Sequence, residues 1–405
     1  MNAEELGRRL LGEVEEAGME EILTSLRFLA SPFPHSSFDI PSLDRLLASA
    51  QAPPGPQVQQ AQAPGPCSSP TRPSTVIIPS HSLPKTKAKP PIIELTSTAP
   101  GSGKTQLLYF ITALATLPPL ALSGISLYGK SAAVVVIDTD GHFSVPRLVE
   151  VMKAHISRCK SSSQPHSRPA SSRSNEGTRS IGRFDMMRMI KEALTHVHIF
   201  RVTSPSSLLA TIESLSTYLF DTNAHHSGNR AVHSIILDSV TAFHYLLPPI
   251  QPSHTTNEST PKLTSAQFYQ SVLSALKTVQ QTFSCNILYT SVSLPPARPS
   301  NTTNSTPSHI PANLPRSLLP ISWYAFPTLR LLLARENVPP VAPAMSVQEA
   351  RRDRDARQSV VERGGFGMIA LSAGRGELGE SVGFYVRGEE GVVFEEDGTE
   401  EAEIS

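Results

Sequence analysis

The chain has 405 residues, enough for one large domain or two ordinary ones. Apolar residues make up 39% of it and proline fills 36 positions, which indicates a folded core diluted by disordered segments. The 35 basic residues balance the 35 acidic ones, and this balance argues against a protein that holds nucleic acid by bulk charge alone.

The cysteines are odd in number and far apart in the sequence: Cys67, Cys159 and Cys285. Their spacing predicts neither a disulfide framework nor a metal site, and it fits a reducing compartment. The stretch 106–129 carries no charge and is long enough to cross a membrane. Because Pro118 and Pro119 interrupt it, we expect no membrane span.

The N-terminal region divides into two segments. Residues 1–48 are predicted to be a helical segment, because apolar residues recur at helical spacing over 4–29. The apolar face of that helix suits either the groove of a partner or the chain's own core. Residues 49–90 are rich in Pro, Gln, Ala and Ser, and they predict a disordered linker.

Residues 91–335 alternate short apolar runs with amphipathic segments, which predicts an α/β domain with a mostly parallel central sheet. The expected strands are 92–95, 132–137, 197–202, 234–237, 286–289 and 328–334. The expected helices are 105–116, 144–156, one that begins at 204–205, and 267–283. A surface insert rich in Ser and Arg is expected at about 159–182.

Three segments follow this core. Residues 336–360 are expected to be a charged spacer, and 361–396 a terminal β-hairpin region that extends one edge of the sheet. Residues 397–405 form an acidic tail. Within the core, the aromatic pair Trp323 and Tyr324 flanks a predicted strand, so we expect it to pack rather than contact DNA bases.

The motif Gly101-Ser102-Gly103-Lys104-Thr105 follows a predicted strand and opens a predicted helix, the context of a phosphate-binding loop. Backbone N–H groups and the positive end of the helix would surround phosphate oxygens. Lys104 would reach the β and γ phosphates, and the Thr105 hydroxyl would hold Mg²⁺. The alternative is a Gly/Ser turn with a surface lysine. The motif predicts ATP and Mg²⁺ as ligands.

One position of the full pattern G-x-x-x-x-G-K-[ST] is not met. Thr98 stands where the first glycine belongs, and threonine disfavours positive φ. Either Gly101 provides the turn instead, or the affinity for nucleotide is weakened.

Two further strands end in acids. Asp238 closes the apolar run 235–237, about 130 residues after the loop, and this order predicts a carboxylate that orients Mg²⁺ through water. Asp140 follows the strand 132–137, and a carboxylate there could orient an attacking water as a catalytic acid–base group. The alternatives are helix caps or solvated turns, which also favour Asp.

These three motifs in this order resemble the RecA family, and within it the eukaryotic recombinase paralogues. The most specific stretches are IDTDGHFSVPRLVEVM and SIILDSVTAFHY, which are most similar to the branch of X-ray repair cross-complementing protein 2. The resemblance covers about 91–335 and implies a RecA-like P-loop domain. It assigns phosphate and Mg²⁺ to Lys104 and Thr105, Mg²⁺ to Asp238 and the water-orienting role to Asp140.

The resemblance also implies a nuclear protein. It would be an ATP-binding subunit of a hetero-oligomer of recombinase paralogues, acting in homologous recombination and DNA double-strand break repair. It would reach DNA through that complex.

Departures from the family pattern predict weak or no ATP hydrolysis. Asp140 stands where strand-exchange recombinases carry Glu, and a misplacement of about 1 Å can cost roughly 100-fold in rate. The pair Thr290-Ser291 stands where they carry Asn-Gln. The segments 246–265 and 293–322, which match DNA-binding loops, hold few cations. Two other functions remain open: a scaffold with a vestigial pocket, and an unrelated P-loop kinase.

Overall fold

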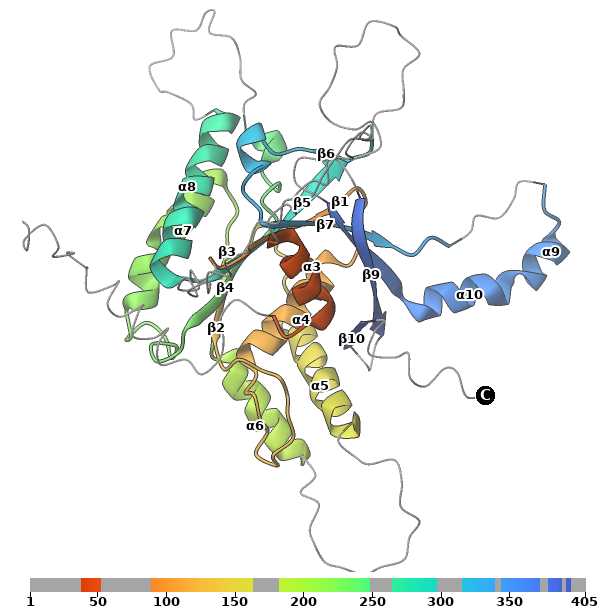
Figure 1. Ribbon diagram of the computed structural model, residues 1–405, viewed down its shortest axis with the longest axis horizontal. Helices are drawn as coiled ribbons and strands as arrows, with labels where there is room; N and C mark the ends of the chain where they lie inside the picture. Colours follow the sequence, from red (N-terminus) through yellow and green to blue (C-terminus); the bar gives the residue numbers. More distant parts are fainter. Residues whose placement is uncertain are drawn as a thin grey trace, which may run out of the picture.

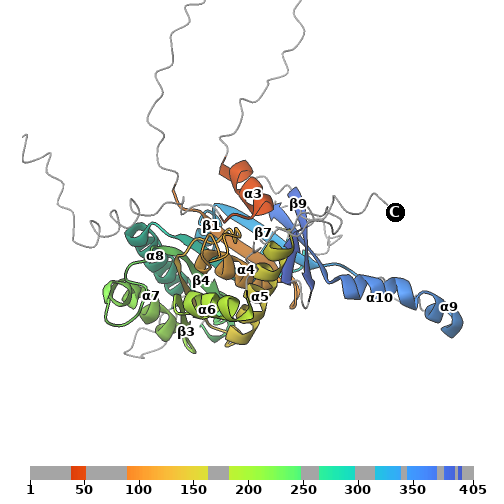
Figure 2. The same cartoon turned by 90° about the horizontal axis from the view of Figure 1, so that it is seen from below.

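The computed structural model describes residues 38–51, 89–162, 182–247, 264–296, 315–338, 344–371, 378–387 and 391–394. Several predictions from the sequence fall outside these ranges: the helix over 4–29, most of the linker and of the insert, and the acidic tail. Figures 1 and 2 show the described elements from two directions.

One sheet runs through the protein, in the strand order β10-β9-β8-β7-β1-β5-β4-β2-β3, with β6 paired to β5. The mutually parallel strands are β1 (Ile92–Ser97), β2 (Ala133–Asp138), β3 (Val197–Arg201), β4 (Val232–Asp238), β5 (Asn286–Leu294) and β7 (Leu329–Arg335). The antiparallel strands are β6 (Arg316–Ser317), β8 (Gly365–Leu371), β9 (Leu378–Arg387) and β10 (Gly391–Phe394). The mostly parallel α/β sheet that the sequence predicts is confirmed.

Helices cover both faces of the parallel part, as Figure 1 shows. One face carries α4 (Lys104–Thr116), α5 (Val145–Ser162) and α6 (Arg183–Leu194), and the other carries α7 (Pro205–Phe220) and α8 (Ser265–Phe283). Short 3-10 turns lie at His244–Leu246 and Ile321–Trp323.

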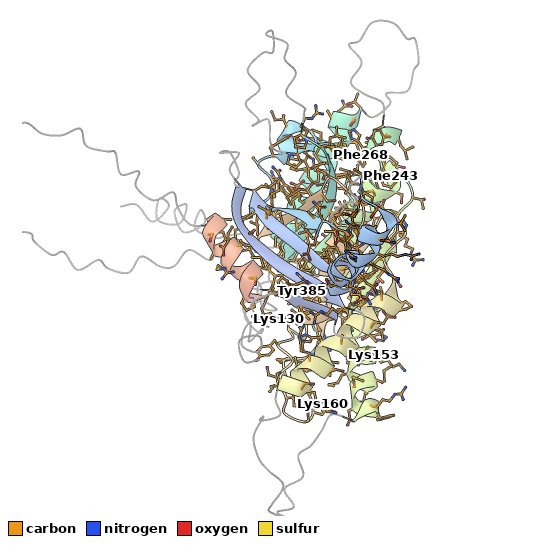
Figure 3. The ribbon with its side chains drawn as sticks, turned by 90° about the vertical axis from the view of Figure 1, so that its right-hand side faces the viewer. Lys130, Lys153, Lys160, Phe243, Phe268 and Tyr385 are labelled. Atoms are coloured by element: carbon orange, nitrogen blue, oxygen red, sulfur yellow. The ribbon has the colours of Figure 1, made fainter. Side chains whose placement is uncertain are left out.

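Alternate residues of β2 divide between the two cores. Val134 and Val136 pack with the α4 side, whereas Val135 and Ile137 pack with the α7 side. Because successive strand residues face opposite sides of a sheet, an uninterrupted apolar run is what a strand covered on both faces requires. Figure 3 shows Phe243 and Phe268 of the α7 side at the opposite end of the molecule from Lys153 and Lys160 on α5.

The helix α3 (Pro41–Gln51) precedes the core and packs on it. Leu43, Leu46 and Leu47 are buried against the α4 side of the sheet. The predicted boundary between helical segment and linker, at residue 49, therefore falls inside α3. The pattern is hard to detect because the helix is short and contributes only one apolar stripe.

Two other boundaries differ from the predicted ones. The helix α5 continues to Ser162, so the insert begins later than residue 159. The predicted spacer 336–360 contains α9 (Val347–Arg352) and the start of α10 (Arg354–Arg363). A capping box formed by Ser346 and Glu349 begins α9, and it is the signal in the sequence that predicts this helix.

The uncharged stretch 106–129 is not one helix, because α4 ends at Thr116 and irregular chain follows. In the part of the chain that the structure describes, no helix is both long and apolar enough to cross a membrane. Trp323 packs as expected: its side chain is buried and its Nε1 donates to the Tyr269 carbonyl oxygen at 3.1 Å.

Candidate nucleotide-binding site

The loop between β1 and α4 has the backbone of a phosphate-binding loop. Gly101 and Gly103 have φ angles of 67° and 91°, in the region that favours glycine, and α4 begins at Lys104. The left-handed turn therefore lies at Gly101, and Thr98 does not have a positive φ. The N-terminal N–H groups of α4 face this loop, which suits phosphate oxygens.

Gly103 is needed for packing as well as for its φ angle. A Cβ atom at this position would lie 2.8 Å from Cδ1 of Phe366 on β8 and 3.0 Å from Cζ of Phe384 on β9. The two phenylalanine rings stack on each other, with centroids 5.3 Å apart. The loop is thus in direct contact with the terminal antiparallel strands.

Lys104 points back across the loop. Its Nζ donates to the Ser97 hydroxyl at the end of β1, and to the Ser102 hydroxyl at 3.4 Å. Burial lowers the pKa of the Lys104 amine, and the nearby carboxylates of Asp238 and Asp140 oppose this shift. These contacts disfavour the alternative of a surface lysine in solvent. Ser97 is a site residue that the motif does not predict.

Asp238, at the end of β4, is held by two hydroxyl groups. Thr105 Oγ1 donates to its Oδ2 at 3.0 Å, and Thr290 Oγ1 donates to its Oδ1 at 2.5 Å. Burial raises the pKa of Asp238, whereas these two hydrogen bonds lower it. The peptide bond between Asp238 and Ser239 is cis.

These residues fit a magnesium ion that is shared with a nucleotide. Mg²⁺ commonly takes one or two carboxylates and completes its shell with phosphate oxygens and water. Thr105 and Asp238 supply one hydroxyl and one carboxylate beside the phosphate loop. Within the described ranges no cluster of three or more His, Cys, Asp or Glu side chains could hold a metal.

The acid that ends β2, Asp138, and the acid that follows it, Asp140, have different environments. Asp138 is buried, and its carboxylate accepts the backbone N–H groups of His142 at 3.2 Å and Phe143 at 3.1 Å. Asp140 is exposed and forms no hydrogen bond or ion pair within the described residues. Desolvation raises the pKa of Asp140, and the Asp238 carboxylate adds to this effect. Asp138 shapes the loop, and Asp140 remains available.

Neighbouring residues on β5 serve different clusters. Thr290 contacts Asp238, whereas the Ser291 hydroxyl donates to Glu94 Oε1 at 2.7 Å. Glu94 is completely buried on β1, and Arg330 Nε on β7 donates to its Oε2 at 2.5 Å. Because successive strand residues face opposite sides, only one member of this pair can reach the nucleotide site. The contact of Thr290 depends on strand pairing, which the sequence does not reveal.

A cavity of about 610 Å³ opens beside the phosphate loop, within the range of small-molecule sites. Gln106 and Arg147 form part of its wall, and the Gln106 Oε1 accepts from Arg147 Nε at 3.1 Å and Nη2 at 3.0 Å. The opposite wall comes from β7, α10, β8 and β9. The sequence motifs do not predict this second wall.

No protein-family model matches the chain. The chain is 27% identical over 143 residues to the protein named DNA repair protein RAD51 homolog 2 of Homo sapiens. The match supports a recombinase paralogue of the RAD51/RecA type. It covers 35% of this chain and only 27% of that relative. With the mostly parallel sheet, it agrees with a RecA-like domain. It does not support the X-ray repair cross-complementing branch in particular.

Proposed function

We propose that the protein is an ATP-binding subunit of a recombinase-paralogue complex that promotes homologous recombination and DNA double-strand break repair. The observation that carries the proposal is the meeting of Lys104, Thr105 and Asp238 at the carboxyl ends of β1 and β4. Ligands of open α/β sheets gather at such strand ends. The distant similarity to a RAD51 homologue supports the same assignment.

In this proposal ATP is bound with Mg²⁺, and hydrolysis is weak or absent. The loop N–H groups and Lys104 hold the phosphates, while Thr105 and Asp238 hold the ion. Asp140 orients the attacking water from a side chain one methylene shorter than Glu, so the water is poorly aligned. Bound Mg²⁺ would supply charge neutralisation at the phosphates.

The protein acts in the nucleus as part of a hetero-oligomer and meets DNA through its partners. The segments 246–265 and 293–322 hold few basic residues. This supports indirect contact with DNA, since each phosphate contact normally needs Lys or Arg. Arg158, near the end of α5, is occupied within the protein: its Nη1 donates to the Val392 carbonyl oxygen at 2.7 Å. The motifs IDTDGHF and LDSVTAF favour the X-ray repair cross-complementing protein 2 branch.

The first test is binding of a fluorescent ATP analogue with Mg²⁺ to the full chain and to Lys104→Ala. We expect saturable binding that the substitution abolishes. Lys191→Ala is the matched control, because Lys191 is an exposed lysine on α6. No binding to the wild-type chain would contradict the proposal, and so would equal binding to Lys104→Ala.

A scaffold that does not use nucleotide is the second candidate. The hydrogen bond from Ser291 to Glu94 favours this candidate. Ser291 stands where strand-exchange recombinases carry Gln, and here its side chain binds a buried carboxylate instead of facing the nucleotide site. The two candidates differ in one measurement: a scaffold assembles with its paralogue partner equally well as wild type and as Lys104→Ala.

A further inference from the structure

An arm lies between β7 and β8, and its base touches the phosphate-loop cavity. Figures 1 and 2 both show α9 and α10 projecting from the body of the protein. The helix α10 ends at Arg363, and the next residue, Gly364, has a φ of 61°; a Cβ there would lie 2.6 Å from the Val386 carbonyl oxygen. The Val386 N–H donates to the Gly364 carbonyl at 3.0 Å. The end of the arm is therefore fixed against β9.

The cavity joins the phosphate loop to this fixed end. On the side opposite the loop, its wall is formed by Arg335, Val361, Glu362, Gly364, Phe366, Val386 and Arg387. Figure 3 looks onto the strands that carry this wall, with Tyr385 labelled. Phe366 also packs against Gly103, so the two walls meet at one residue of the loop.

The two walls differ in chemistry. The loop offers N–H groups and Lys104, which suit phosphate. The opposite wall offers apolar surface from Val361, Phe366 and Val386, flanked by two guanidinium groups and by the Glu362 carboxylate. Flat apolar surface and guanidinium planes are what a nucleobase packs against. Inorganic tripolyphosphate has only phosphate groups, so it can bind the loop but has nothing apolar to pack on the opposite wall. The nucleoside of ATP supplies that apolar group.

We propose that the base of the α10 arm and the terminal strands form the nucleoside-binding half of the site, with Val361 as an apolar contact and Arg335 and Arg387 at its rim. This inference rests on the proposed ATP binding and adds which segment recognises the nucleoside. It follows that ATP binds more tightly than inorganic tripolyphosphate, and that the excess affinity depends on the arm rather than on the loop.

The test is calorimetric titration of the full chain, in the presence of Mg²⁺, with ATP and with inorganic tripolyphosphate. Val361→Asn removes apolar surface without adding charge, and Val361 is 49% exposed, so folding is not at risk. Val347→Asn is the matched control, since Val347 is 70% exposed on α9 and does not line the cavity. Arg335→Ala with Arg387→Ala is the second variant, and Arg352→Ala on α9 is its control.

We expect Val361→Asn to weaken ATP about tenfold, as the loss of roughly 1.4 kcal/mol would, and tripolyphosphate less than about twofold. The double arginine variant should also reduce the difference in affinity between ATP and tripolyphosphate. Both control variants should bind the two ligands as the wild type does. Equal weakening of the two ligands, or no change in either, would overturn the inference. If tripolyphosphate binds in a Lys104-dependent way but no more weakly than ATP, the phosphate loop stands and the nucleoside wall fails. Binding of neither ligand removes the proposed function itself.

Discussion

Two polar clusters share the strand β5, and they differ in how completely their polar groups are paired. Around Glu94, Tyr289, Ser291 and Arg330 supply donors to both carboxylate oxygens, and Glu94 is completely buried. Around Asp238, two hydroxyls and Lys104 gather beside an open cavity, and the nearby Asp140 is exposed. A closed network stabilises a fold, whereas a partly open one is arranged for a ligand.

The largest effect should come from breaking the closed cluster. Glu94→Ala leaves the partly buried Arg330 without its carboxylate partner, and losing one partner of a buried ion pair costs about 3–5 kcal/mol in the free energy of unfolding. Urea denaturation measures this cost, with Glu213→Ala on the exposed face of α7 as the control. Nucleotide affinity of the folded fraction should stay unchanged. A loss of unfolding free energy below about 1 kcal/mol would show that the Glu94 cluster does not stabilise the fold more than an exposed ion pair does.

The open cluster should gain activity from a longer acid. Asp140→Glu extends the carboxylate by one methylene, and we expect phosphate release to rise by about 10- to 100-fold, because alignment of the water improves. Asp140→Asn removes the charge and should abolish any residual hydrolysis while ATP still binds. If Asp140→Glu stays as inactive as wild type, the side chain is not the element that limits hydrolysis.

A smaller effect should follow at the boundary between the clusters. Thr290→Val removes the hydrogen bond to Asp238 Oδ1, which costs about 1–2 kcal/mol of unfolding free energy. It should also raise the pKa of Asp238 further, so that Mg²⁺-dependent ATP binding is lost at a higher pH on acidification. Titration of binding between pH 7 and pH 4 tests this. Thr278→Val, at an exposed position of α8, is the control.

The smallest effect concerns histidines outside both clusters. Burial lowers the pKa of His155 and of His198 from 6.5 to about 4. Only the unfolded chain takes up their protons between these values, so stability is full above pH 6.5 and falls as the pH drops towards 4. We expect a loss of about 1 kcal/mol per histidine between pH 7 and pH 5.5. His198→Gln should remove the part of this pH dependence of the unfolding free energy that comes from His198. If the variant shows the same pH dependence as the wild type, His198 is not its source.

The sequence predicts the parallel strands well because each is a short apolar run between turns. The helix α6 is not among the predicted elements, although Met186, Met189, Ile190 and Ala193 recur at helical spacing. Loop geometry at Gly101 and Gly103 follows from local residues. The partners of Lys104 are harder, because its contact with Ser97 depends on how the loop folds back over β1.

Contacts between distant segments account for the rest of what the sequence does not reveal. Thr290 reaches Asp238 because β4 and β5 are neighbours, which no single-sequence pattern reports. The cavity wall at α10 depends on the contact of Phe366 with Gly103, and in the sheet β7 separates the strand of Phe366, β8, from β1. Such pairings arise from tertiary packing, which overrides local propensity.

The position of β1 in the sheet also constrains how the protein can fold. Ile93 pairs with Leu288 on one side and with Leu329 on the other, and the Ile92 N–H donates to a hydroxyl of Thr328, 236 residues later. Parallel pairing across such separations makes folding slow. During synthesis from the N-terminus, the phosphate loop therefore gains both of its flanking strands only after β7 has left the ribosome. Nucleotide can therefore assist folding only after the C-terminal third of the chain has been released, and not as soon as the phosphate loop has been translated.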